Sequence, residues 1–233
     1  MMKTGTIRIS ELAISRPAIY EAMRYGDAVP DGYICGLVEE VISELSAAAD
    51  AGADRTDGFL PAYMLGIVPA ERLDDLHVRL GGEDFCAGSI ICSYLDGMTH
   101  ACVFVATAGK VFEEYRSAVH ASGDIVKDFV VDAVGSIVAE STVTVVQDVL
   151  TELSPLKRTM PCSPGYCGWN IKEQQRFFSL FPQDPCGIWL TESCLMQPEK
   201  SVSGFFGLGE TLVPQPYRCA VCTNKSCYKN RNR

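Results

Sequence analysis

The chain has 233 residues, a formal net charge of −9 and eleven cysteines. Hydrophobic residues make up 47% and charged residues 21%, which excludes a largely disordered protein and suits one large domain or two small ones. The acidic balance disfavours nonspecific nucleic-acid binding by the whole body, and the odd number of cysteines excludes complete pairing within the chain.

The N-terminal residues carry no apolar segment typical of a secretory signal. No continuous apolar run reaches the roughly 18 residues that indicate a membrane span, so we expect none. We therefore predict a cytoplasmic protein. In that reducing compartment cysteines act as core fillers, metal ligands or redox groups rather than as bridges.

The first 120 residues predict alternating strands and helices. Apolar residues recur every three or four positions in residues 32–49, which is typical of an amphipathic helix. Pro17 suits a first helical turn, so a short helix is expected over residues 17–24. Further helices are expected at 89–94 and 111–120, and strands at 6–10, 57–67 and 101–106.

A long helix is expected to begin after Asp124, whose carboxylate favours a helix N-terminus, and to end before Pro155. Gly135 in its middle permits a close neighbour. The β-branched stretch 142–146 weakens the prediction that this helix is continuous.

Three segments after residue 160 stand out, at 162–169, 190–198 and 201–207. Pro164 and Gly165 predict a type II turn, because glycine accepts the positive φ required at its position. A tight turn packed by Tyr166 and Trp169 explains the first segment without any ligand. Capped strand ends explain the other two equally well.

Together, the three segments resemble a known family. Pro-Gly-Tyr at 164–166, Leu-Thr-Glu-Ser at 190–193 and Ser-Val-Ser-Gly at 201–204 are similar in order and spacing to the activation domain of cobalamin-dependent methionine synthase. The clear match covers residues 163–207, and nothing resembles the synthase's homocysteine, folate or corrinoid modules. The resemblance implies a free-standing activation protein with an α+β fold, a twisted antiparallel sheet with packed helices.

The resemblance also implies a function in methionine biosynthesis: reductive reactivation of a corrinoid-dependent methyltransferase. Cob(II)alamin is returned to cob(I)alamin or methylcobalamin, with S-adenosylmethionine as methyl donor. The implied partners are a corrinoid-binding methyltransferase or shortened methionine synthase and a flavodoxin- or ferredoxin-like electron donor. The chain would be the activation component of such a system.

The implied site lies on the turn. Tyr166 is the expected catalytic residue, and the expected cofactor-binding residues are Ser163, Pro164, Gly165, Tyr166, Glu192 and Ser203. Glu192 is expected either to contact the ligand's ammonium group or to cap a strand. Pro161 stands where the family usually has an arginine that pairs with the ligand's carboxylate, and proline offers no donor.

The last segment reads C-x2-C-x4-C and contains Cys219, Cys222 and Cys227, a spacing that suits a metal or cluster. Cys167 is the expected fourth ligand because its turn should lie near the active face, and Cys162 and Cys186 are the alternatives. Zinc and a [4Fe–4S] cluster both fit the spacing. The cluster is favoured because the implied chemistry needs an electron, and three free thiols are the remaining alternative.

We predict a body of residues 1–214, helix-rich over 1–156 and motif-bearing over 157–214, followed by a cysteine-rich tail of 215–233. The tail carries five basic and no acidic residues, which leaves −14 on the rest of the chain. The tail's charge could balance metal-bound thiolates or guide an acidic electron donor, whereas the acidic body disfavours nucleic acid. A second hypothesis is an iron–sulfur or zinc accessory protein that docks a corrinoid protein without S-adenosylmethionine.

Overall fold

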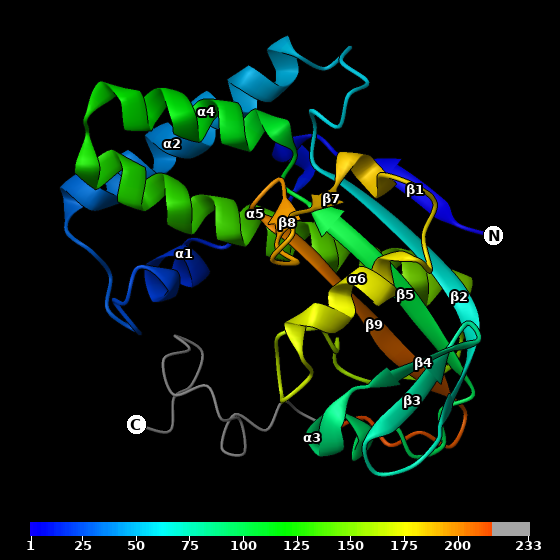
Figure 1. Cartoon of the computed structure of the whole chain (residues 1–233). Helices are drawn as coiled ribbons and strands as arrows, with labels where there is room; N and C mark the ends of the chain where they lie inside the picture. The colour runs from blue at the N-terminus through cyan, green and yellow to red at the C-terminus, as the bar shows by residue number, and fades with distance from the viewer. Residues whose placement is uncertain (216–233) are drawn as a thin grey trace.

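The computed structural model describes residues 1–215 as a sheet with helices on both faces (Figure 1). Its α-helices are α1 (Arg16–Ala22), α2 (Gly32–Ala51), α3 (Gly88–Cys92), α4 (Lys110–Ser122), α5 (Ile125–Leu153) and α6 (Gln174–Phe178). Its short 3-10 helices are η1 (Ile9–Glu11), η2 (Ile171–Glu173) and η3 (Pro185–Gly187). Its strands are β1 (Lys3–Thr6), β2 (Ala62–Arg72), β3 (His77–Leu80), β4 (Glu83–Cys86), β5 (His100–Thr107), β6 (Lys157–Arg158), β7 (Trp189–Leu190), β8 (Met196–Gln197) and β9 (Ser201–Gly209).

The main sheet is antiparallel and has seven strands in the order β4-β3-β2-β5-β9-β6, with β1 also paired to β2. β5 is central: it pairs with β2 over its whole length and with β9 from Thr107 opposite Ser201 to His100 opposite Leu208. β7 and β8 form a separate two-stranded hairpin. The third sequence motif therefore lies on β9, inside the main sheet.

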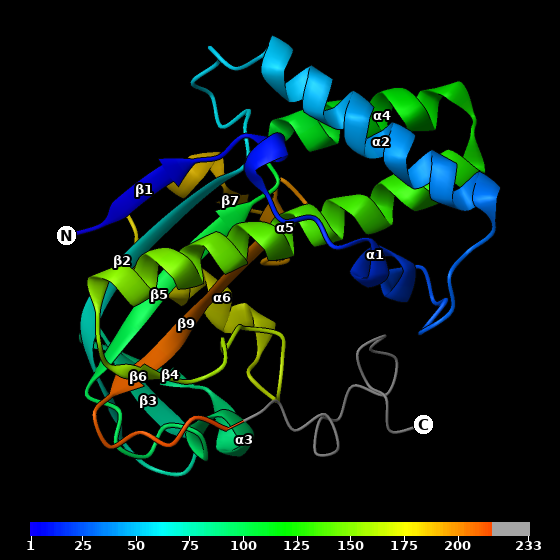
Figure 2. The same cartoon turned by 180° about the vertical axis from the view of Figure 1, so that it is seen from behind.

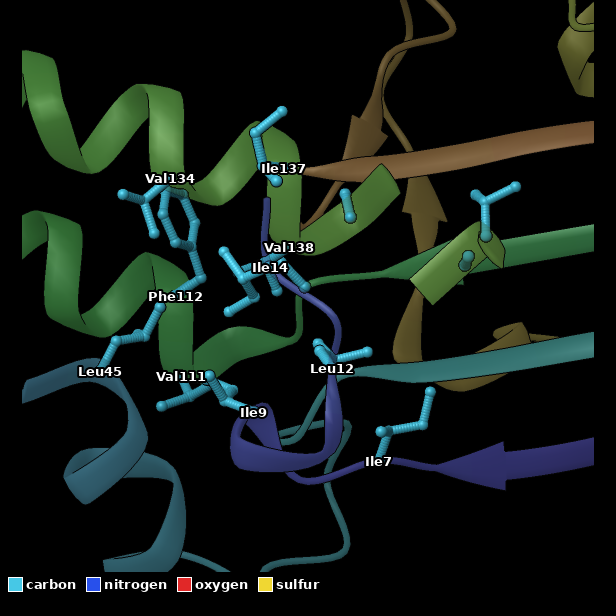
Figure 3. Close-up of a cluster of buried hydrophobic side chains, with 14 of the residues drawn as sticks. Ile7, Ile9, Leu12, Ile14, Leu45, Val111, Phe112, Val134, Ile137 and Val138 are labelled. Carbon is cyan, nitrogen blue, oxygen red and sulfur yellow. The ribbon is translucent and has the colours of Figure 1, made fainter. Parts of the chain in front are cut away.

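One face of the sheet is covered by α5, with α1, α2 and α4 packed beyond its N-terminal half (Figure 2). Four apolar side chains from the segment 7–14 enter this layer, namely Ile7, Ile9, Leu12 and Ile14. Figure 3 shows Ile9 near Val111 and Ile14 near Val138. Gly135 allows α4 to approach α5, because a Cβ there would lie 2.1 Å from the Phe112 ring. The close neighbour expected at this glycine is confirmed.

The opposite face carries a second core, covered by α3, α6 and the segment around Trp169 (Figure 1). Trp169 is 1% exposed and makes edge contacts with Phe85, Phe177 and Phe205 at centroid distances of 5.8 to 5.9 Å. Phe205 belongs to β9. This aromatic cluster therefore fixes the segment that follows the predicted turn against the sheet.

The predicted α+β class is confirmed. The helices expected at 17–24, 32–49, 89–94 and 111–120 correspond to α1, α2, α3 and α4. α5 begins after Asp124, whose side chain accepts a hydrogen bond from Lys127 N, and it runs unbroken through the β-branched stretch. That stretch stays helical because Thr142, Val143 and Val146 are buried by tertiary packing.

Two strand predictions need correction. The strand expected at 6–10 lies earlier, at Lys3–Thr6, and residues 9–11 form η1 because Ile7 and Ile9 turn into the core. The strand expected at 57–67 begins at Ala62 and continues to Arg72. The β3–β4 hairpin was not predicted, although Gly81 and Gly82 both have the positive φ of a tight turn.

The sheet takes β2 and β5 from residues 1–156 and β6 and β9 from residues 157–214. The division into a body and a tail at residue 215 stays a prediction. Within the described range, α5 alone is long and apolar enough to span a membrane, and 67% of its apolar window is buried inside the fold, as in a core helix.

Candidate functional site

The first motif forms the tight turn that its sequence predicts. Tyr166 N donates to Ser163 O at 3.2 Å, and Gly165 has a φ of +89°. Gly165 N and Trp169 O close the far side of the turn at 2.8 Å. Trp169 anchors the segment in the core, whereas Tyr166 is 54% exposed. The turn therefore presents a tyrosine side chain at the surface from a fixed backbone.

The first and third motifs are in direct contact. Cys162 and Phe205 exchange two backbone hydrogen bonds of 2.9 Å, which tie the start of the turn to β9. A Cβ on Gly204 would lie 2.5 Å from Cys162 O and 2.7 Å from Ser163 Oγ. The glycine of Ser-Val-Ser-Gly is therefore needed for the turn to approach the strand.

The second motif is connected to the third through Gln174, a residue that the sequence did not single out. The turn between β7 and β8 exposes the Cys194 carbonyl to Gln174, whose Nε2 donates to it at 2.8 Å. Oε1 of the same amide accepts a hydrogen bond from Ser203 Oγ at 3.1 Å. Gln174 is buried on α6, and it precedes Phe177 by three positions and Phe178 by four. That spacing is the signal that could have placed it on a buried face.

The predicted site residues therefore divide into two groups. Ser203 is 2% exposed, and its hydroxyl donates a hydrogen bond to Gln174. In this position the side chain helps to hold the second and third motifs together. Glu192 lies exposed in the turn between β7 and β8. Ser163 and Tyr166 face a pocket, and neither side chain makes a hydrogen bond with another residue of the described chain.

The pocket beside the turn is small, with a cavity volume of about 20 Å³. It is lined by Ile91, Tyr94, Thr159, Met160, Pro161, Cys162, Ser163, Tyr166, Cys167 and Gln215. None of these side chains is ionised in its ordinary state at neutral pH. Arg158 lies nearby in sequence, but its guanidinium donates to Gln147 O and Thr151 Oγ1 on α5, on the other side of the sheet.

Two cysteines line this pocket and differ in environment. Cys162 is 6% exposed, and burial raises the pKa of its thiol to about 12. Cys167 is only partly buried and has a φ of +52°, in the left-handed region. Non-glycine residues rarely adopt this conformation, which costs on the order of 1–2 kcal/mol. The turn therefore holds the Cys167 backbone in a defined, strained position.

The third candidate thiol lies elsewhere. Cys186 is in η3, where its carbonyl packs against Gly58, and burial raises the pKa of its thiol to about 11. Within residues 1–215, no group of three or more histidine, cysteine, aspartate or glutamate side chains is arranged to hold a metal. Cys219, Cys222 and Cys227 lie outside the described residues.

Comparison with known proteins identifies the relatives of this arrangement. A family model described as the activation domain of vitamin B12-dependent methionine synthase matches residues 157–223. A crystal structure of the MetH reactivation domain bound to AdoHcy matches with a TM-score of 0.62 and 15% sequence identity, covering 93% of this chain and 80% of that one. No curated protein matches. The resemblance and the fold predicted from the sequence are both confirmed.

Proposed function

Because this chain is a homologue of the activation domain of vitamin B12-dependent methionine synthase, we propose that it reactivates a corrinoid-dependent methyltransferase by reduction. The partner is a corrinoid-binding methyltransferase or a shortened methionine synthase, in the cytoplasm and in methionine biosynthesis. The electron comes from a flavodoxin- or ferredoxin-like donor or from a centre bound to this chain. S-adenosylmethionine is the proposed methyl donor, as the AdoHcy in the related structure suggests.

One observation supports this proposal most strongly: three motifs that are distant in sequence are joined in the fold, and the first of them lines a pocket. Gln174 and Gly204 hold the motifs together, which leaves Ser163 and Tyr166 directed at the pocket. In this proposal Ser163, Pro164 and Gly165 shape the ligand-binding turn, Tyr166 contacts the reacting groups and Glu192 borders the site. When bound, S-adenosylmethionine supplies the methyl group whose transfer makes an unfavourable corrinoid reduction irreversible.

The described pocket fits only part of such a ligand. S-adenosylmethionine carries a carboxylate and an ammonium group, and a buried charge needs a partner. The pocket walls offer Ser163 and Tyr166 hydroxyls and apolar surface for the uncharged part. No ionised side chain among the described residues lines the pocket for the charged end, and Pro161 adds no donor.

This uncharged wall favours a second candidate function. In this function the chain docks a corrinoid protein without using S-adenosylmethionine. It either delivers an electron or stabilises one conformation of the partner. The proposed centre would be an iron–sulfur cluster or zinc held by Cys167, Cys219, Cys222 and Cys227. The two candidates share the docking face and differ in the methyl donor.

Reactivation can be tested with an inactive methyltransferase in the cob(II)alamin state, a chemical or flavodoxin reductant, and this chain. With S-adenosylmethionine present, we expect loss of the cob(II)alamin absorbance and recovery of methyl transfer. Recovery that does not depend on S-adenosylmethionine would identify the accessory function. No recovery under either condition with any corrinoid partner would refute both.

A variant pair locates the activity. Tyr166→Ala should lower the reactivation rate about tenfold or more, equivalent to a loss of at least about 1.4 kcal/mol in the barrier. Tyr33→Ala removes another exposed tyrosine, on α2 and outside the pocket, and should leave the rate unchanged. Equal rates for the two variants would place the site elsewhere.

A further inference from the structure

A second cavity adjoins the pocket beside the turn. Its walls come from the segment 93–97, which follows α3, and from the segment 211–215, which follows β9. Tyr94 and Gln215 line both cavities, so the two share a wall. None of the three motifs contributes to the second cavity.

The second cavity forms where the chain that leaves β9 returns to α3 (Figure 2). Gly97 has a φ of +82°, and a Cβ there would lie 2.5 Å from Thr211 Oγ1. Thr99 N donates to Leu208 O at 2.9 Å and holds the end of β9 beside the same loop. The two walls therefore approach each other as closely as they do because residue 97 is a glycine.

The two cavities differ in size. The pocket beside the turn, at about 20 Å³, has room for about one water molecule. A ligand that contains a nucleoside or an amino acid cannot fit there alone. The second cavity has a volume of about 340 Å³, within the range of about 300–1,000 Å³ that is typical of small-molecule sites. Most of a ligand that reaches the turn must therefore lie outside the small pocket.

The two cavities also differ in charge. Asp96 brings a carboxylate to the wall of the second cavity, where it pairs with Arg72. The same guanidinium also pairs with Asp75, so one positive charge is shared by two carboxylates and a net charge of −1 remains. No lysine or arginine among the described residues lines this cavity. The hydroxyl groups of Ser93 and Thr211 add hydrogen-bonding partners.

We propose that the second cavity binds the ammonium group of a ligand whose uncharged part extends past Tyr94 and Gln215 towards Tyr166, and that Asp96 pairs with this group. The chemical class is a primary amine carried on an uncharged body. Glu192 lines neither cavity, which favours Asp96 for this role. The ammonium group of S-adenosylmethionine meets this description, and for that identity alone the assignment rests on the proposed function.

The first test is calorimetric titration of the full chain with S-adenosylmethionine and with 5′-methylthioadenosine, which has the nucleoside and the thioether but no ammonium group. Asp96→Asn should weaken S-adenosylmethionine binding by about tenfold or more and leave 5′-methylthioadenosine binding unchanged. Asp75→Asn is the matched control, because Asp75 pairs with the same arginine but does not line the cavity. It should leave both affinities unchanged.

The second test does not depend on S-adenosylmethionine. 1,4-Diaminobutane is titrated into the isotopically labelled chain while the backbone amide resonances are followed by nuclear magnetic resonance. We expect saturable shifts at Ser93, Gly97 and Thr211 that are lost in Asp96→Asn and kept in Asp75→Asn. Butane-1,4-diol, which has the same length without charge, should cause no shifts.

The inference is overturned if neither S-adenosylmethionine nor 1,4-diaminobutane binding depends on Asp96. It is equally overturned if Asp75→Asn causes the same loss, or if Asp96→Asn weakens 5′-methylthioadenosine as much as S-adenosylmethionine. Diaminobutane binding that depends on Asp96 in a chain that does not bind S-adenosylmethionine would keep the amine site and refute only the proposed methyl donor.

Discussion

The hydroxyl of Ser203 donates a 3.1 Å hydrogen bond to Oε1 of Gln174, and both side chains are only 2% exposed. The other end of the same amide binds Cys194 O at 2.8 Å. A single buried glutamine thus satisfies polar groups from two of the three motifs. Removing it leaves two buried partners unsatisfied rather than one.

We therefore expect Gln174→Ala to lower the free energy of unfolding by about 2–4 kcal/mol, since each unsatisfied buried group costs about 1–3 kcal/mol. Urea denaturation followed by circular dichroism measures the change. Gln175→Ala is the matched control, because Gln175 is the next residue of α6 and is exposed. If both variants are equally stable, the amide does not tie the motifs together.

Gly135→Ala tests the contact between α4 and α5. The added methyl would lie 2.1 Å from the Phe112 ring, so the helices must move apart, at a cost of about 1–3 kcal/mol. Gly36→Ala is its counterpart on α2, where a Cβ meets no atom within 4 Å. There the better helix propensity of alanine should raise the unfolding free energy by about 0.5–1 kcal/mol. In thermal denaturation we expect Gly135→Ala to lower the Tm and Gly36→Ala to raise it.

Pro161→Arg tests whether the uncharged pocket limits S-adenosylmethionine binding. A guanidinium at this wall can pair with the ligand's carboxylate, and a hydrogen bond to a charged group contributes about 1.5–3 kcal/mol. Calorimetric titration should show affinity that is about tenfold higher or more. Pro161→Gln, which adds length without charge, should give a much smaller gain. Equal gains would mean that proline's shape, and not the missing charge, limits binding.

Buried thiols predict a loss of stability at alkaline pH. Burial raises the pKa of Cys102 and of Cys162 to about 12, whereas a thiol in the unfolded chain ionises near about 8.5. Because only the unfolded state gains the charge between these values, the free energy of unfolding falls as pH rises from about 8.5 towards 12. Each thiol should account for about 1–2 kcal/mol at pH 10.

Urea titrations at about pH 7.5 and pH 10 check this effect. Cys102→Ala should lose less stability between the two pH values than the wild type does, by about 1–2 kcal/mol. The change in unfolding free energy between the two pH values is compared within each protein. The pH-independent destabilisation caused by the substitution therefore cancels. An identical decline in both proteins would show that Cys102 does not contribute.

The sequence predicted elements well where local signals and packing agree. α2 follows its apolar periodicity, and α5 begins at the expected Asp124 cap and ends before Pro155. The turn at Pro164 and Gly165 was also predictable, because only one backbone geometry suits that pair.

What the sequence did not reveal depends on distant partners. Gln174 has a role only because Ser203 and Cys194 reach it from other elements. Ile7 and Ile9 alternate as in a strand, but both are drawn into the helical core, which moves β1 towards the N-terminus. The uncharged character of the pocket likewise emerges only when residues from α3 and the turn meet.

The pairing of β9 with β5 limits how this protein can be dissected. The family signature occupies residues 157–223, but the strand that carries Ser-Val-Ser-Gly completes its ladder on a strand that ends at Thr107. A truncation that begins at residue 157 would expose the hydrogen-bonding edge of β9 and the apolar side chains of Phe205 and Phe206. Such a fragment would aggregate rather than fold, so binding studies require the body and the signature in one polypeptide.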